Sequence, residues 1–260
     1  MTDLVKLDIT QGLATLTLAR PEAGNAMNWD MVADLGTATG TLANDRSVRA
    51  VLIRAEGKNF SVGGDLKAFA AAADPADFIG RLADAMHVSI RRLADLPAPV
   101  VVAVQGAAAG GGLGLAISGD IVLADPGASF SMAYSGVGLT ADGGATWYLP
   151  RLIGLRRTQE LAYTNRRLSA EEAERHGLVT RVVTGAPLDQ EARATAEAIA
   201  TGPTAAFAAV KRLLATGDKA SLADQLAAES ASMRKAMQSP DAQGAVRAFL
   251  AREKPTFAGR

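Results

Sequence analysis

The chain has 260 residues, with 27 basic and 27 acidic side chains and no cysteine. These counts exclude a disulfide-held fold or a thiol nucleophile, and they give no net charge that would attract nucleic acid or an anionic membrane. No apolar run is long enough to span a bilayer and the N-terminus lacks a signal pattern, so we expect a cytoplasmic protein with no membrane partner.

Short strands alternate with helices over the first 187 residues. Apolar patterning predicts strands over residues 4–9, 14–18, 50–54, 100–104, 121–124, 128–131 and 178–183, the first two forming a hairpin around Gln11-Gly12. Helical spacing predicts helices over residues 28–42, 78–93, 113–118, 156–163 and 169–177. Residues 70–77 are small and polar, and we expect a mobile loop there that helps to shape a binding pocket.

After Pro187 the pattern is helical, with helices predicted over residues 189–200, 204–215, 221–238 and 240–252. Alternating strands and helices followed by a helical tail predict an α/β protein, with a core over residues 1–187 and a helical region over 188–260. Apolar residues of the tail, such as Phe207, Val210 and Leu214, follow helical spacing. They need a partner surface, which is either the chain's own core or a second copy.

Two strand–glycine–helix junctions, at Gly63-Gly64 and Gly110–Gly112, stand out from the rest of the chain. Backbone N–H groups point outward at such a junction, and the helix dipole favours negative charge there. If the junctions face each other, two N–H groups converge as required to hold an enolate or tetrahedral oxygen. The alternative is that the glycines only allow close packing of helix against strand.

Four motifs occur in order along the chain. They are Asn25-Ala26-Met27, residues 60–67, residues 105–112, and Asp142 to Trp147 with Leu149 to Gly154. Together they resemble the crotonase superfamily, the enoyl-CoA hydratases and isomerases, over essentially the whole chain. The resemblance implies a ββα spiral core with a C-terminal helical trimerisation region, a homotrimer or hexamer, and an acyl-CoA thioester substrate. No separate cofactor is implied, because CoA is part of the substrate. The family's oxyanion-hole donors fall on the N–H groups of Gly64 and Gly111.

The acidic residues depart from the hydratase pattern. Crotonase-type hydratases carry glutamates at the positions of Gly114 and Tyr134, and water addition needs two such carboxylates. Asp142 matches the acid of some family isomerases, including those of phenylacetate and dienoyl-CoA metabolism. This favours an isomerase with one catalytic acid, although Asp-Gly-Gly is also a common turn sequence. The alternatives are a hydratase that uses another acid or a positioned water, and a non-catalytic acyl-CoA-binding or assembly subunit.

The residues expected to bind the substrate are Ala26, Val62, Gly64, Lys67, Gly111, Tyr134, Trp147 and Arg252. Lys67 and Arg252 are placed like basic residues that reach CoA phosphates in relatives, and Tyr134 and Trp147 are expected to exclude water. Asp65 is expected to cap a helix. The two histidines, His87 and His176, are expected to be structural, and we predict no metal site.

Overall fold

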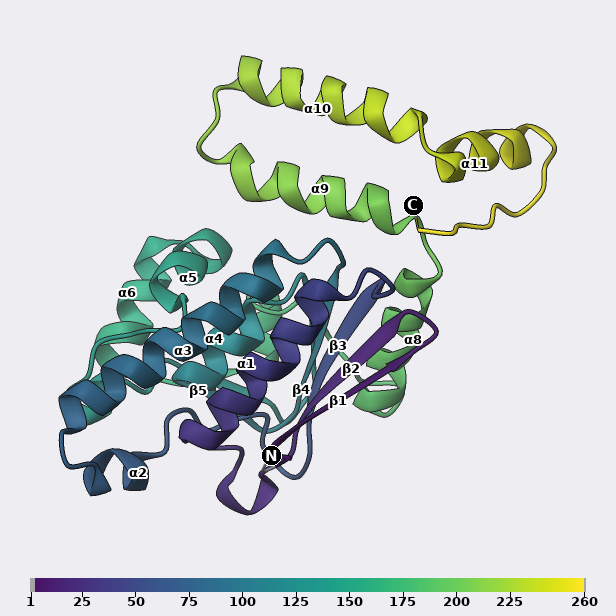
Figure 1. Cartoon of the computed structure of the whole chain (residues 1–260). Coiled ribbons are helices and arrows are strands. Elements are labelled where there is room, and N and C mark those ends of the chain that lie inside the picture. Colours follow the sequence, from purple (N-terminus) through teal and green to yellow (C-terminus); the bar gives the residue numbers. More distant parts are fainter. Residues whose placement is uncertain (1–2, 260) are drawn as a thin grey trace.

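A six-stranded sheet lies at the centre of the molecule (Figure 1), in a computed structural model that describes residues 3–259. Its strands, in spatial order, are β1 (Val5–Thr10), β2 (Leu13–Leu18), β3 (Ala50–Ala55), β4 (Val100–Val104), β6 (Ile121–Ala124) and β9 (Arg181–Val182). The first two form the predicted antiparallel hairpin, and every later pair is parallel. Parallel pairs need long connections, and the helices supply them.

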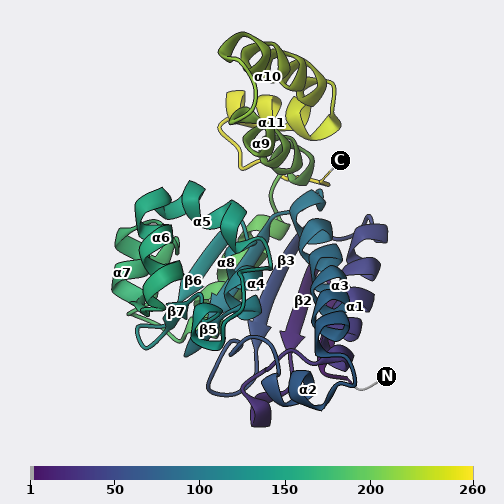
Figure 2. The ribbon, with the colours of Figure 1, turned by 90° about the vertical axis from the view of Figure 1, so that its left-hand side faces the viewer.

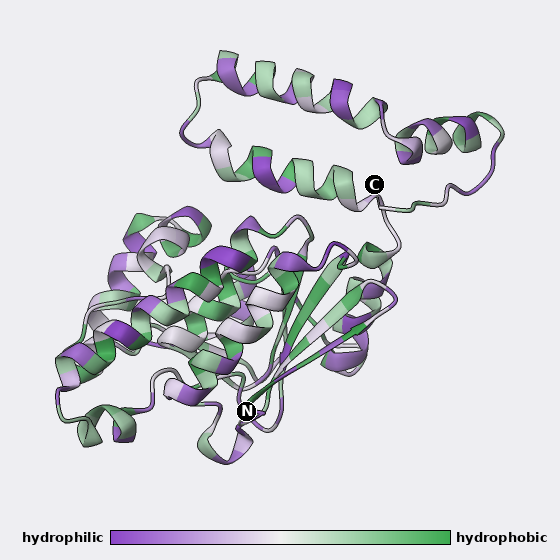
Figure 3. Cartoon of the chain, viewed as in Figure 1, coloured by the Kyte–Doolittle hydropathy of each residue, from purple (hydrophilic) through white to green (hydrophobic). Residues whose placement is uncertain are grey.

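Helices cover both faces of this sheet (Figure 2). The alternate residues Val100, Val102 and Val104 of β4 pack in the cluster that includes α1 (Trp29–Asn44), α3 (Pro75–Asp95) and α4 (Gly111–Ile117). Val101 and Ala103 instead contact the buried alanines of α8 (Leu188–Ala200). This burial on two sides explains why β4 reads as an uninterrupted apolar run, and Figure 3 shows the hydrophobic colour along the central strands.

A second sheet of three strands contains an element that sequence patterning missed. β5 (Ala107–Ala109) pairs in parallel with β7 (Ser129–Ser131), which pairs with β8 (Leu168–Ser169). The three alanines after Gly106 were expected to be part of a glycine-rich loop. They form a strand because Ala108 is fully buried and bridges to Ser61 on its other side, a close approach that larger side chains would prevent.

The expected loop over residues 70–77 is mostly helical, so that expectation was wrong. The first residues of this stretch belong to the end of α2 (Leu66–Ala71). α3 begins at Pro75, and Asp74 accepts hydrogen bonds from N–H groups in its first turn. The remaining elements of the core are α5 (Ala145–Ile153), α6 (Leu155–Thr164) and α7 (Ala170–Arg175), with short 3-10 turns at Pro21–Ala23 and Ser135–Val137. The last predicted strand of the core is shorter than expected, covering only β9.

Three C-terminal helices project from the core (Figures 1 and 2): α9 (Thr204–Gly217), α10 (Leu222–Met237) and α11 (Pro240–Leu250). α8 packs on the sheet, although the sequence grouped it with the tail over 188–260; whether 1–187 and 188–260 are separate folding units stays a prediction. Lys211 of α9 donates to Asp120 Oδ2 at 2.8 Å and to the carbonyl of Leu93 at 3.0 Å, which ties α9 to the core. No helix in residues 3–259 is long and apolar enough to cross a membrane.

Candidate active site

The two glycine junctions lie in direct contact. A Cβ atom built at Gly63 would lie 2.8 Å from the carbonyl oxygen of Ala109, and one built at Gly110 would lie 3.7 Å from the Gly63 Cα. Gly63 and Gly110 also have φ angles of +93° and +52°, a region that favours glycine. The lack of side chains at these glycines therefore lets the two backbone segments pack closely side by side.

Each junction presents a free backbone N–H group to one cavity. Met27 donates to the Gly63 carbonyl and accepts from the Asp65 N–H, so the N–H of Gly64 between them points away from Met27. Gly111 is the first residue of α4, where N–H groups have no acceptor within the helix. Within the described residues, neither N–H donates to another protein group. Both glycines line the same cavity.

This cavity of about 290 Å³ is mainly apolar. Its walls come from residues of α2 and α3 and from the segment before α5: Leu66, Phe69, Ile79, Leu82, Ala83, Met86, Val137 and Leu139. Residues 70–77 were expected to shape the pocket, but none of them is among the residues that line it. Phe69 was missed, yet its ring lies 2.5 Å from where a Gly64 Cβ would be, so it closes the cavity beside one N–H donor.

Asp142 reaches this cavity together with Tyr134. The Tyr134 hydroxyl donates to Asp142 Oδ1 at 2.5 Å, a short hydrogen bond. Burial raises the pKa of Tyr134 well above its ordinary value, and the negative charge of Asp142 raises it further. The phenol therefore stays neutral and remains a donor. Asp142 is the only carboxylate among the described residues that line the cavity.

The turn that carries Asp142 occupies the space next to Gly114. A Cβ atom built at Gly114 would lie 2.6 Å from the carbonyl oxygen of Gly143. No side chain fits at position 114 unless this turn moves. The two differences from the hydratase pattern are thus linked in space, since Gly114 makes room for the turn and Tyr134 binds its carboxylate.

The other predicted binding residues lie at varying distances from the cavity. Val62 lines it, and Ala26 adjoins the lining residue Met27. Lys67, in the first turn of α2, and Arg252, just beyond α11, are not among the lining residues. Trp147 does not line the cavity either, and the Arg151 guanidinium lies 4.1 Å from its ring centroid. Roles for Lys67, Trp147 and Arg252 in binding stay predictions.

Asp65 does cap α2, accepting hydrogen bonds from the N–H groups of Lys67 and Ala68. Its second oxygen accepts from Arg20 at 2.8 Å, and Arg20 also donates to the Ala26 carbonyl at 2.7 Å. Burial raises the pKa of Asp65, but the hydrogen bonds from Arg20 and Ala68 outweigh that effect, leaving the pKa below its ordinary value. The capping prediction is confirmed, and the cap also fixes the loop that precedes Met27.

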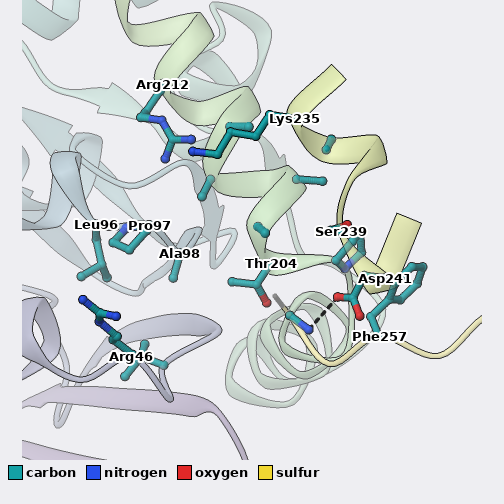
Figure 4. Close-up of a pocket in the computed structure, with 18 of the residues that line it drawn as sticks. Arg46, Leu96, Pro97, Ala98, Thr204, Arg212, Lys235, Ser239, Asp241 and Phe257 are labelled. Atoms are coloured by element: carbon teal, nitrogen blue, oxygen red, sulfur yellow. Dashed lines mark hydrogen bonds between the residues drawn. The ribbon is translucent and has the colours of Figure 1, made fainter. Parts of the chain in front are cut away.

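A larger cavity of about 770 Å³ lies between the C-terminal helices and the core (Figure 4). Arg46, Arg212 and Lys235 line it, and Asp241 accepts there from the N–H of Gly259 at 2.7 Å. Neither glycine junction nor Asp142 reaches this cavity, so the smaller one is the candidate active site. Among the described residues, no group of three or more His, Asp or Glu side chains is placed to hold a metal ion.

The chain resembles known proteins in both sequence and fold. The profile of the family described as enoyl-CoA hydratase/isomerase matches residues 8–260. The chain is 37% identical to the 1,2-epoxyphenylacetyl-CoA isomerase of Escherichia coli K12, covering 100% of both chains. It is also 37% identical to a probable enoyl-CoA hydratase of Rhodobacter capsulatus, covering 98% of both. A crystal structure from Mycobacterium abscessus, of a protein assigned to the enoyl-CoA hydratases/isomerases, matches with a TM-score of 0.95 at 39% identity, covering 98% of this chain and 100% of that one.

Proposed function

Since the chain belongs to the enoyl-CoA hydratase/isomerase family, we propose that it moves a carbon–carbon double bond along the acyl group of an enoyl-CoA thioester. The observation that carries the proposal is a single carboxylate, Asp142, in an apolar cavity with two free N–H donors. The substrate in this proposal is an acyl-CoA, and CoA belongs to it rather than acting as a cofactor.

The two N–H donors provide the first part of the chemistry. Gly64 and Gly111 hold the thioester oxygen, on which negative charge develops when a proton leaves the acyl chain. Donors fixed in this way stabilise the resulting dienolate, each by about 3 kcal/mol. The hydrogen bonds to this oxygen therefore orient the substrate and lower the pKa of the C–H group next to the thioester carbonyl.

Asp142 provides the second part. Its carboxylate takes a proton from one carbon of the acyl chain and returns it two carbons along, which restores the base. Tyr134 binds Oδ1 and leaves the second carboxylate oxygen for the substrate. The cycle needs neither a water molecule nor a second acid, which fits a cavity lined by one carboxylate and by apolar side chains.

Two alternatives predict different outcomes. A hydratase would add water to a 2-enoyl-CoA, and the relatives include a probable hydratase as well as an isomerase. Against it, the Gly143 carbonyl lies where a side chain at position 114 would have to start. A non-catalytic acyl-CoA-binding or assembly subunit would bind the thioester and turn over none of it.

The test is a panel of linear and ring-bearing 2- and 3-enoyl-CoA thioesters, each assayed separately for double-bond migration and for water addition. We expect migration on at least one member and slower or no hydration. Hydration that outruns migration throughout would favour the hydratase, and binding without exchange of the α-proton would favour the binding subunit.

Replacing Asp142 tests the assignment of the base. Asp142→Asn keeps the size of the side chain and removes its basicity, so isomerisation should fall by about 10³-fold or more while a saturated acyl-CoA binds as before. Asp218→Asn, on the surface beside Arg151, is the matched control and should leave both unchanged. If Asp142→Asn isomerises the substrate at the parent rate, Asp142 is only a turn residue and not the base.

The proposal extends to assembly into a homotrimer or hexamer. Its support is the exposed apolar surface of the C-terminal helices, where Leu214, Leu222, Met233 and Phe249 are each at least 72% exposed. Within residues 3–259 nothing in the core covers these side chains, and a second copy offers a surface that would. A cytoplasmic location stays a prediction from composition.

A further inference from the structure

The turn after Asp142 has little internal restraint. Gly143 and Gly144 have φ angles of +59° and +77°, and neither has a side chain to limit its motion. Within the turn, Ala145 donates its N–H to the Asp142 carbonyl at 3.0 Å. The direction of the Asp142 carboxylate therefore depends on contacts from outside the turn.

His87 of α3 supplies one of these contacts. The Gly143 N–H donates to His87 Nε2 at 3.1 Å, across 56 residues of sequence, and the described residues offer this N–H no other acceptor. An imidazole nitrogen accepts only when it carries no proton, so this contact requires neutral His87 with its proton on Nδ1. Ile90, one turn along α3, approaches the same glycine, its Cδ1 3.7 Å from where a Gly143 Cβ would lie.

We propose that His87 is a positioning residue for the acid–base step, holding the Asp142–Gly143 peptide in place through its neutral imidazole. The inference rests on the proposed role of Asp142. His87 does not line the cavity, so it acts on the substrate only through that peptide. Tyr134 restrains the carboxylate itself, and His87 restrains the backbone that carries it.

Two substitutions separate hydrogen bonding from packing. His87→Leu removes the acceptor, whereas His87→Gln places an amide oxygen close to the position of Nε2; both residues favour helices. We expect His87→Leu to lower kcat about tenfold or more, because small displacements of a catalytic group are costly. KM and the affinity for a saturated acyl-CoA should change by less than about twofold, and His87→Gln should recover most of kcat. His176→Gln, at the other histidine of the chain, should leave every value unchanged.

Amide hydrogen exchange at Gly143 gives a readout independent of turnover. We expect Gly143 to be protected in the parent and in His87→Gln, and to exchange faster in His87→Leu. The proposal is overturned if His87→Leu keeps the parent kcat, or if His87→Gln falls as far as His87→Leu. If the parent isomerises no thioester in the panel, the proposed function fails, and exchange at Gly143 alone then decides the role of His87: equal protection in all variants would overturn it.

Discussion

Tyr134 is a neutral hydrogen-bond donor to the proposed base. Crotonase-type hydratases carry a glutamate at this position. A glutamate here would add a second negative charge beside Asp142 and would repel its carboxylate. Replacing it by Tyr134→Phe removes one hydrogen bond to a charged group, worth about 1.5–3 kcal/mol. We expect kcat for isomerisation to fall by about tenfold to a hundredfold, and binding of a saturated acyl-CoA to persist.

The matched control for this variant is Tyr163→Phe, because the Tyr163 side chain is 78% exposed on α6. It should leave kcat and binding unchanged. A Tyr134→Phe enzyme as active as the parent would show that Asp142 needs no partner at Oδ1.

The raised pKa of Tyr134 predicts how the site responds to alkaline pH. Burial, followed by the charge of Asp142, disfavours the phenolate in the folded protein, so the pKa lies above the ordinary 10.0. A group with a raised folded-state pKa contributes stability that is fully present below 10.0 and is lost as the pH rises through the folded value.

A spectrophotometric titration checks this prediction. Below pH 10.0, the phenolate absorbance of the folded parent and of Tyr134→Phe should rise to the same extent, since Tyr134 does not ionise in that range. A smaller rise in the variant would mean that Tyr134 ionises as an ordinary tyrosine, and its assignment as a fixed donor would then be wrong.

Some residues of the candidate site could be singled out from the sequence through the family resemblance. Asp142, Gly64 and Gly111 lie within the motifs that carry this resemblance, and the structure brings all three to one cavity. His87 was expected to be structural because of its place in an amphipathic helix. Its contact with the Gly143 N–H, 56 residues away, has no signal in the local sequence. Phe69 was missed for a similar reason, since a side chain is identified as a cavity wall only once its helix is placed.

The packing of α4 against the Asp142 turn yields a prediction about position 114. Gly114→Ala places a Cβ atom 2.6 Å from the Gly143 carbonyl oxygen, so the turn must move. We expect a loss of about 1–3 kcal/mol in the free energy of unfolding, together with reduced isomerase activity. Gly114→Glu should do worse on both counts and should not produce a hydratase.

The control is Gly244→Ala, in the interior of α11, where a Cβ atom would meet nothing within 4 Å. It should stabilise the protein by about 0.5–1 kcal/mol, because alanine favours helix. Chemical denaturation and the isomerase assay measure both effects. Unchanged stability in Gly114→Ala would show that the turn shifts freely, and the steric argument against a hydratase would lose its basis.

Most elements followed from periodicity and caps, such as the capping box at Ser169, which the structure contains in full. The errors occurred where tertiary contacts determine local structure. Residues 107–109 look like a loop because alanine has weak strand preference, yet they pair on both sides within a crowded interior. In residues 70–77, Asp74 and Pro75 form a helix-start signal, which was overlooked because the stretch was interpreted as small and polar.

The C-terminal helices bury little of their surface against the core. Lys211, with its side chain 12% exposed, anchors α9 to the core, whereas α10 contains no buried residue. The same helices carry many exposed apolar side chains: Val210, Leu214, Leu222, Leu226, Met233, Met237, Val246, Phe249 and Leu250. Burying one such side chain stabilises a complex by about 1.5–3 kcal/mol, so several together favour association over exposure.

We therefore expect light scattering at about micromolar concentration to report three or six times the chain mass of 26.8 kDa. The double substitution Leu222→Glu with Leu226→Glu puts two charges on α10, where these side chains are 75% and 54% exposed, and should shift the mass toward the single chain. Tyr163→Glu adds a charge at a side chain of α6 that is 78% exposed, and should leave the mass unchanged. A parent that is monomeric at this concentration would refute the trimer, and an unaffected double variant would move the interface away from α10.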